Sequence, residues 1–250
     1  MFFLLINLSS IIALLGVPKE NVNLFSLRHS KRAKRLIFKP SVRNGFEIVL
    51  PRLYDANWVL ETLAKNKTRI ERSVSEIREA RIGLKPASIA LPPTGRSWEV
   101  IYREVHENES SSIMETSTTL EVPERLRDPF WAPMSLQAWL HEKAEAYLPK
   151  RLESVAASLQ TSYNKVSIKK LKSRWGSCSI KRNISLNRNL MLMSVEVVDY
   201  VLHHELVHLK VLNHSSRFWK ELERSLPNYK KSLNQLKYFE TNKIPEWALV

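Results

Sequence analysis

The segment from Val195 to Leu212 constrains the fold of this chain more than any other. Its apolar residues recur every three or four positions, which predicts an amphipathic helix, and Ser194 before it is a suitable N-cap residue. His204 and His208 stand four positions apart in this helix, so their side chains share one face, with about 5–6 Å between the Cβ atoms. The fold must therefore either present two imidazoles to a shared ligand or give each one a hydrogen-bond partner in its core.

A carboxylate and a third imidazole accompany this pair. Residues 204–208 read HELVH, so Glu205 lies beside the two histidines, and His214 follows after Asn213, a residue type that commonly ends helices. Two imidazoles one turn apart can bind Zn²⁺ at about 2.0–2.1 Å each, and a neighbouring carboxylate can take a proton from the water on the metal. We predict a Zn²⁺ cofactor with His204, His208 and His214 as ligands and Glu205 as general base.

Other histidine and cysteine arrangements stay open at this point. His204 and His208 can instead be hydrogen-bonded core residues, and His203 points to another part of the helix surface, where a structural role is expected. Cys178 is the only cysteine and lies upstream of the helix, so a deformylase-type hydrolase with Cys178 as a metal ligand is an alternative. A single cysteine excludes an intrachain disulfide and favours a reducing compartment such as the cytoplasm.

Positive charge is concentrated in two stretches of a chain whose formal net charge is +14. Residues 28–43 hold seven Lys or Arg and no acid, and no Asp or Glu occurs from Ser154 to Val195. Such stretches attract polyanions and acidic peptides, or simply form a solvated surface. A protein or peptide is the expected partner of a hydrolase. A nucleic-acid-associated module with a structural zinc and no hydrolysis is the competing reading.

The order of expected elements indicates an α+β protein. Extended segments are expected at 36–51, as a hairpin around Asn44-Gly45, and at 98–105, 166–171 and 178–186, the last with a turn at 181–183. Helices are expected at 55–80, at 134–162 with a restart or kink at Pro149, after Ser215, and at 229–239. The polar stretch 106–133 reads as a loop or linker.

These elements suggest three regions along the chain. Residues 1–22 begin with an apolar run that is shorter than the roughly 20 residues of a membrane helix, so no stable span is expected, while a signal, an anchor or an edge strand all stay open. Residues 23–133 form a β-rich amino-terminal subdomain that ends in the polar linker. Residues 134–250 carry the histidines and form the catalytic subdomain.

Several short motifs in this last region match a known family in order and spacing. They are Arg174 to Ser179 (RWGSCS), Ile184 to Asn187 (ISLN), His204 to Leu209, Asn213 to Ser215, and Phe218-Trp219. Together they resemble the YgjP-like metallopeptidase domain, a relative of the SprT and WLM zinc peptidases. The resemblance implies a small zincin-like fold with an amino-terminal β-rich subdomain. It maps the family's three ligands to His204, His208 and His214 and its catalytic acid to Glu205.

The RWGSCS segment suggests where a substrate binds. A strand that precedes the active-site helix can receive an extended peptide by strand addition, and Gly176 permits close approach of another backbone. Arg174 can hold a carboxylate or a polarised carbonyl of the substrate. Trp175 lies between Arg174 and Gly176 in the sequence. Alternatively, Trp175 is a core residue, Gly176 forms a bulge and Arg174 makes a structural ion pair.

Overall fold

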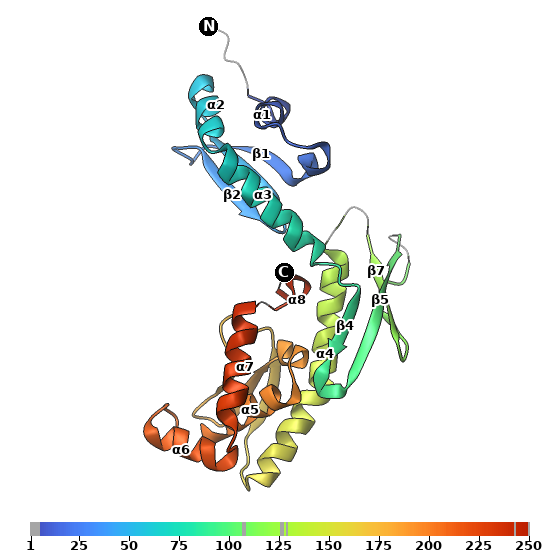
Figure 1. Ribbon diagram of the computed structural model, residues 1–250, viewed down its shortest axis with the longest axis vertical. Helices are drawn as coiled ribbons and strands as arrows, with labels where there is room; N and C mark the ends of the chain where they lie inside the picture. Colours follow the sequence, from blue (N-terminus) through green and yellow to red (C-terminus); the bar gives the residue numbers. More distant parts are fainter. Residues whose placement is uncertain (1–5, 107–108, 126–127, 129, 243, 250) are drawn as a thin grey trace. The chain divides into compact units, whose positions relative to one another are not determined.

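The chain was analysed as a computed structural model that describes residues 6–106, 109–125, 128, 130–242 and 244–249 (Figure 1). It divides into two compact units. Unit 1 spans Met1–Leu84 and unit 2 spans Lys85–Leu249. The boundary between Leu84 and Lys85 differs from the subdomain boundaries expected at residues 22 and 133.

Unit 1 combines a small sheet with helices. Its elements are α1 (Leu8–Leu15), the 3-10 helix η1 (Lys19–Leu24), β1 (Phe25–Ser30), β2 (Ile37–Ser41), β3 (Gly45–Pro51), α2 (Ala56–Lys65) and α3 (Lys67–Ile82). The strand order is β1-β3-β2, with β1 parallel and β2 antiparallel to β3. The hairpin expected at Asn44-Gly45 is therefore confirmed. Gly45 has a φ of 75°, a left-handed conformation that favours glycine.

The expected helix at 55–80 is present but divides at Asn66 into α2 and α3. The apolar stripe of α2 and α3 packs on the sheet, and so does α1. Ile11 and Leu15 of α1 are at most 2% exposed and share one apolar core with Phe46 and Leu63. The apolar amino-terminal run thus supplies core residues to unit 1. No helix in the described part of the chain is long and apolar enough to cross a membrane.

Unit 2 contains two sheets and five α-helices in its described residues. The first sheet has the order β4-β5-β7-β6, and the second has the order β8-β10-β9. The bounds are β4 (Ser88–Leu91), η2 (Pro92–Thr94), β5 (Arg96–Glu104), β6 (Met114–Glu115), β7 (Thr119–Glu124), α4 (Trp131–Ser158), β8 (Lys165–Lys169), β9 (Gly176–Cys178), β10 (Asn183–Asn187), η3 (Arg188–Leu192), α5 (Val195–Val207), α6 (Ser216–Ser225), α7 (Tyr229–Asn242) and α8 (Glu246–Leu249).

The linker expected at 106–133 is wrong in part, because it contains β6 and β7. β7 lies inside the sheet, where it pairs in parallel with β5, and its residues Leu120 and Val122 are fully buried. These two side chains alternate onto one face and join the same core as Leu140 of α4 and Leu202 of α5. The first sheet therefore belongs to the unit that carries the histidines.

α4 is the longest helix and is central to unit 2 (Figure 1). It runs from Trp131 to Ser158 as one helix that includes Pro149, where a restart or kink was expected. The strand expected at 178–186 is two strands, β9 and β10, joined by a turn in which Arg182 has a φ of 59°. β9 lies at the edge of its sheet. The last expected helix, α7, is followed by α8, whose Trp247 is 2% exposed.

Candidate functional site

The three predicted metal ligands meet in unit 2. His204 lies in the last turn of α5, His208 directly follows the helix, and His214 lies in the bend before α6. The Nε2 atom of His204 is 3.2 Å from that of His208 and 2.9 Å from that of His214. One ligand atom from each residue lies within 4.8 Å of the other two. α5 ends earlier than the expected Leu212, and this early end allows the bend that returns His214 to the cluster.

Several contacts fix these rings. The Nδ1 atom of His208 lies 3.0 Å from the carbonyl oxygen of Val211, which can only accept, so Nδ1 carries the proton and Nε2 keeps its lone pair. Phe218 is fully buried, and its ring centroid lies 4.6–4.8 Å from those of all three histidines. Trp219 donates its Nε1 proton to the backbone carbonyl of His214 at 3.1 Å, and its ring stacks on the His214 imidazole. Phe218 and Trp219 of α6 therefore position His214, the candidate ligand that lies outside α5.

This geometry fits a divalent cation of the zinc type. Tetrahedral ligands at about 2.0–2.1 Å from an ion are about 3.3–3.4 Å apart, close to the separations of these Nε2 atoms. Burial, followed by the neighbouring His208 and His214, lowers the pKa of His204 to about 3, so its imidazole is held in the neutral form that binds metals. Three imidazoles whose ring nitrogens converge form a suitable donor set for such a cation.

Glu205 lies beside the cluster and is almost completely buried, with 5% of its surface exposed. Its Oε2 atom has no hydrogen-bond partner, which is costly for a buried carboxylate unless a ligand or water approaches it. Burial raises the pKa of Glu205 to about 8, and the charge of Arg174 acts in the opposite direction. A cation bound by the adjacent imidazoles would also lower this pKa and favour the ionised form.

Gly176 of β9 makes room for this carboxylate. A Cβ atom at position 176 would lie 2.6 Å from Oε1 and 2.7 Å from Cγ of Glu205, closer than a real Cβ atom approaches. The absence of a side chain at Gly176, the first residue of β9, therefore makes room for the Glu205 side chain of α5. The two walls of the site, β9 and α5, touch through these two residues.

A cleft of about 490 Å³ opens over the histidines and Glu205. It is also lined by Arg174, Trp175 and Gly176, so all three residues predicted to contact substrate lie at the site. Arg174 is exposed, whereas Trp175 donates its Nε1 proton to Glu240 at 2.7 Å. Further lining residues not predicted to bind substrate are Tyr200, Val201, Leu212 and Leu236.

Asn187 holds the segment that carries these substrate-side residues. It is 2% exposed, and its Nδ2 donates to the carbonyl oxygens of Leu171 at 2.9 Å and Arg174 at 3.1 Å. Its backbone N–H donates to the carbonyl of Trp175 at 2.8 Å. No local sequence pattern reveals this role, because the bonded residues are 12 or more positions away.

The free edge of β9 faces away from β10. Backbone hydrogen bonds join residue 175 to 187 and residue 179 to 183. Because hydrogen-bonded pairs alternate along an antiparallel ladder, the N–H and C=O groups of Gly176 and Cys178 point to the opposite side. Both residues line the cleft, so these groups can pair with an extended chain.

Two other candidates do not join the ligand cluster. His203 is 9% exposed, and its Nδ1 lies 2.8 Å from the carbonyl of Asp199 on the same helix, as expected of a structural residue. Cys178 lines the cleft, but the converging group among the described residues is the histidine trio alone. Burial, followed by the charge of Glu205, raises the pKa of Cys178, which disfavours the thiolate that binds metals.

Comparison with known proteins agrees with this site. The family described as YgjP-like, metallopeptidase domain, matches residues 34–239, which extend over both units. The metallopeptidase zymogen abylysin of Pyrococcus abyssi is 30% identical, with 36% of this chain and 90% of that chain covered and a TM-score of 0.33. For the metallopeptidase zymogen jannalysin of Methanocaldococcus jannaschii these values are 25%, 38%, 97% and 0.33. No curated protein matches the chain.

The family match gives no support to the interpretation of the chain as a nucleic-acid-associated module. The α+β class and the amino-terminal sheet expected from the sequence are confirmed. The family match covers more than half of the chain and includes every residue of the cleft. The chain therefore belongs to the YgjP-like metallopeptidase family.

Proposed function

We propose that the chain is a zinc-dependent peptidase of the HExxH type. The observation that carries the proposal is the convergence of the His204, His208 and His214 nitrogens next to the buried, unpaired carboxylate of Glu205. Three protein ligands leave one coordination position open, as in catalytic zinc sites. When bound, Zn²⁺ would activate a water molecule and polarise the carbonyl of the scissile peptide bond.

The protein groups then have distinct tasks. Glu205 accepts the proton of the attacking water and delivers it to the leaving amine. The Val211 carbonyl keeps the His208 ring in position, and the Phe218 ring packs against all three imidazoles. Burial of Glu205 excludes bulk water from the proton-transfer step, which strengthens electrostatic interactions within the site.

The substrate lies along the free edge of β9. Its backbone pairs with the N–H and C=O groups of Gly176 and Cys178, so binding depends little on the substrate's side chains. Arg174, at the mouth of the cleft, interacts with a substrate carbonyl or carboxylate, and Trp175 supports the strand by packing on Phe239 of α7. The single Cys178 agrees with a reducing compartment such as the cytoplasm.

Replacement of Glu205 tests this function. Glu205→Gln keeps the size of the side chain and leaves the three imidazoles in place, so we expect one zinc ion per chain. Hydrolysis of an unfolded protein substrate should fall by a factor of about 10²–10⁴, the usual contribution of a general base. Metal content by mass spectrometry and substrate digestion with and without chelator measure the two properties.

Glu196→Gln is the matched control, because Glu196 lies on the same helix but is exposed in its first turn. It should change neither zinc content nor hydrolysis. Full hydrolysis by Glu205→Gln, or hydrolysis that survives complete removal of metal, would contradict the proposal. His214→Ala and Cys178→Ser distinguish the ligand sets, since only the first should lower zinc affinity.

A further inference from the structure

A second groove runs along α4 in unit 2 and shares no lining residue with the catalytic cleft. Its volume is about 520 Å³. We call it the α4 groove, and its lining residues are Leu91, Thr94, Arg96, Trp98, Lys143, Ala146, Tyr147, Lys150, Arg151 and Ser154. The α4 members recur at intervals of three or four, so they form one continuous face of the helix. The opposite wall comes from η2 and the beginning of β5.

The charged side chains that line this groove have one sign. Four of its lining residues are cations and none is an acid. The acidic residues in this half of α4, Glu142, Glu145 and Glu153, do not line the groove. Ala146 is exposed and Tyr147 is half-buried, so these two provide apolar surface between the cations, whereas Leu91 and Trp98 line the groove but are only 0% and 2% exposed. An apolar floor with a cationic rim suits a ligand that has apolar and anionic groups close together.

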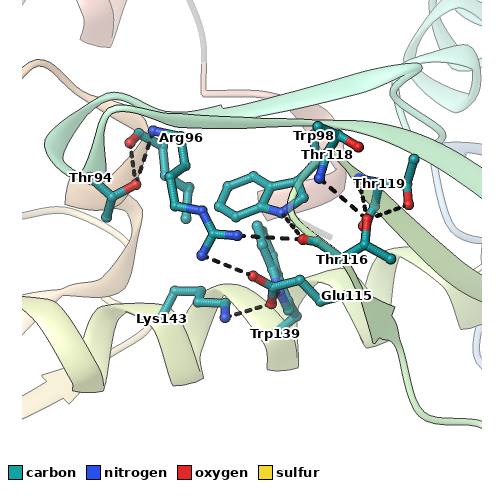
Figure 2. Close-up of polar contacts among 10 residues, drawn as sticks. Thr94, Arg96, Trp98, Glu115, Thr116, Thr118, Thr119, Trp139 and Lys143 are labelled. Carbon is teal, nitrogen blue, oxygen red and sulfur yellow. Dashed lines mark hydrogen bonds and ion pairs between the residues drawn. The ribbon is translucent and has the colours of Figure 1, made fainter.

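Two of the cations are already held in position (Figure 2). Glu115 accepts from Trp139 Nε1 at 2.9 Å, contacts Lys143 Nζ at 2.5 Å and lies 3.5 Å from Arg96. The guanidinium of Arg96 also lies over the Trp98 ring, 4.6 Å from its centroid. Both cations keep further N–H donors for a ligand. Side chains that are ordered before binding lose less conformational entropy when a ligand arrives.

The remaining two cations lie further along α4. Arg151 makes two hydrogen bonds to Asp199 of α5, at 2.7 and 2.6 Å. Lys150 is exposed, and no acidic side chain in the described part of the chain forms an ion pair with it. Four cations with two carboxylates, those of Glu115 and Asp199, leave two positive charges uncompensated. A ligand of this groove therefore needs at least one anionic group.

We propose that the α4 groove binds an acidic segment of a polypeptide with an apolar side chain at its centre. The helix rises about 16 Å over the 11 positions from Lys143 to Ser154, the length of about five extended residues. Glutamates or aspartates of the segment contact Lys150, Lys143 and Arg96, and the apolar side chain lies on Ala146 and Tyr147. For a peptidase this is a second attachment site for the substrate, an extension that rests on the function proposed above.

Peptide binding tests this proposal apart from catalysis. The full chain with Glu205→Gln is titrated into a short fluorescein-labelled peptide in which glutamates flank a central phenylalanine, and anisotropy is measured. We expect Lys150→Glu to weaken binding about tenfold, since it replaces an attraction by a repulsion. Ala146→Trp, which fills the groove without a change in charge, should weaken it at least as much. Binding should also weaken as salt concentration rises.

Lys181→Glu is the matched control, because Lys181 is also exposed in unit 2 but does not line the groove. It changes the net charge equally and should weaken binding by less than about twofold. An equal loss in Lys181→Glu, or equal binding of a peptide with glutamine at each glutamate position, would overturn the proposal. Displacement of the peptide by inorganic phosphate at equal concentration would also overturn it and assign the groove to small anions. These results do not depend on whether the chain hydrolyses peptides.

Discussion

The two units differ in what they bury. In unit 1, the fully buried side chains are apolar, and its cations lie in exposed positions such as Lys31, Arg32, Lys34 and Arg35. In unit 2, polar and charged side chains enter the core at Gln137, Asn187, Arg188, Asn189, His203, Glu205, His208 and Ser232. Burial of such groups costs free energy unless they find partners. Of these residues, Glu205 and His208 line the cleft and Asn187 holds the segment before β9, so part of this cost is connected with the site.

The difference shows which parts of the chain are arranged for chemistry and which for stability. The core of unit 1 follows from the hydrophobic pattern of its helices and strands, since its members only need to be apolar and of suitable size. The core around the histidines requires specific partners at specific distances. Substitutions in unit 1 should therefore change stability alone, whereas equivalent substitutions in unit 2 should change stability and activity together.

The largest expected effect comes from Phe218→Ala. This ring is fully buried against the three histidines, so its loss should lower the free energy of unfolding of unit 2 by about 3–5 kcal/mol. The imidazoles also lose the surface that positions them, and zinc affinity should fall. Urea unfolding followed by hydrogen exchange, together with zinc titration against a competing chelator, measures both effects.

Phe46→Ala is the equivalent change in unit 1. Phe46 is 2% exposed and packs between Phe25 and Phe38, so a similar loss of stability is expected there. Zinc affinity should stay unchanged. If Phe46→Ala weakened zinc binding as much as Phe218→Ala, the distinction between the units would not hold.

Gly176→Ala should have the next largest effect. The new methyl group would lie 2.6 Å from Oε1 of Glu205, so the carboxylate has to move within a packed site, at a cost of about 1–3 kcal/mol. Hydrolysis should fall strongly while zinc content persists. The comparison variant is Gly45→Ala in unit 1, where a methyl group would meet the Leu24 carbonyl at 2.1 Å. That variant should unfold more easily yet retain its specific activity when folded, and an inactive folded form would contradict the expectation.

Asn187→Ala tests the buried polar contacts on the substrate side. It leaves the carbonyls of Leu171 and Arg174 without their side-chain donor, which should cost about 1–3 kcal/mol and loosen the segment before β9. We expect KM to rise more than kcat falls. Asn183→Ala in the same strand is the control, because its side chain bonds only to exposed Asn164. Unchanged kinetics in Asn187→Ala would show that β9 is held by other contacts.

The smallest effect is expected for Glu115→Gln and depends on pH. Burial raises the pKa of Glu115, but hydrogen bonds from Lys143 and Trp139 and the charges of Lys143 and Arg96 outweigh it, so the net shift is downward. The stabilisation is thus fully present above the ordinary carboxyl pKa of about 4.3 and is lost as pH falls below it. At neutral pH the variant should lose about 1 kcal/mol, and the difference from the parent should shrink in acid. A pH-independent difference would show that charge contributes nothing.

Much of the site could be predicted because its signals are local. The spacing of His204 and His208 fixes their common face on a helix, and Asn213 marks the bend that returns His214. The hairpin at Asn44-Gly45 has an equally local turn signal. By contrast, the contact between Gly176 and Glu205 joins residues far apart in the chain, and no pattern around either residue reveals it.

The main error in the fold has a similar cause. β7 has only two buried aliphatic residues, Leu120 and Val122, and they lie among polar neighbours and beside a buried proline, Pro123, so the segment resembles a loop. Its parallel pairing with β5 provides the missing stability, and parallel pairing joins segments without a short turn signal. The α4 groove could not be predicted from the sequence for the same reason, because Arg96 and Trp98 approach α4 only in the folded unit.

The bend between α5 and α6 would give a bound metal ion a structural role in addition to its chemical one. An ion bound by rings on both sides of residues 209–213 would connect the end of one helix to the start of the next and act as a crosslink. Binding to the folded form alone adds about 2.7 kcal/mol when free metal is a hundredfold above its Kd. The stability of unit 2 would then depend on the concentration of available metal.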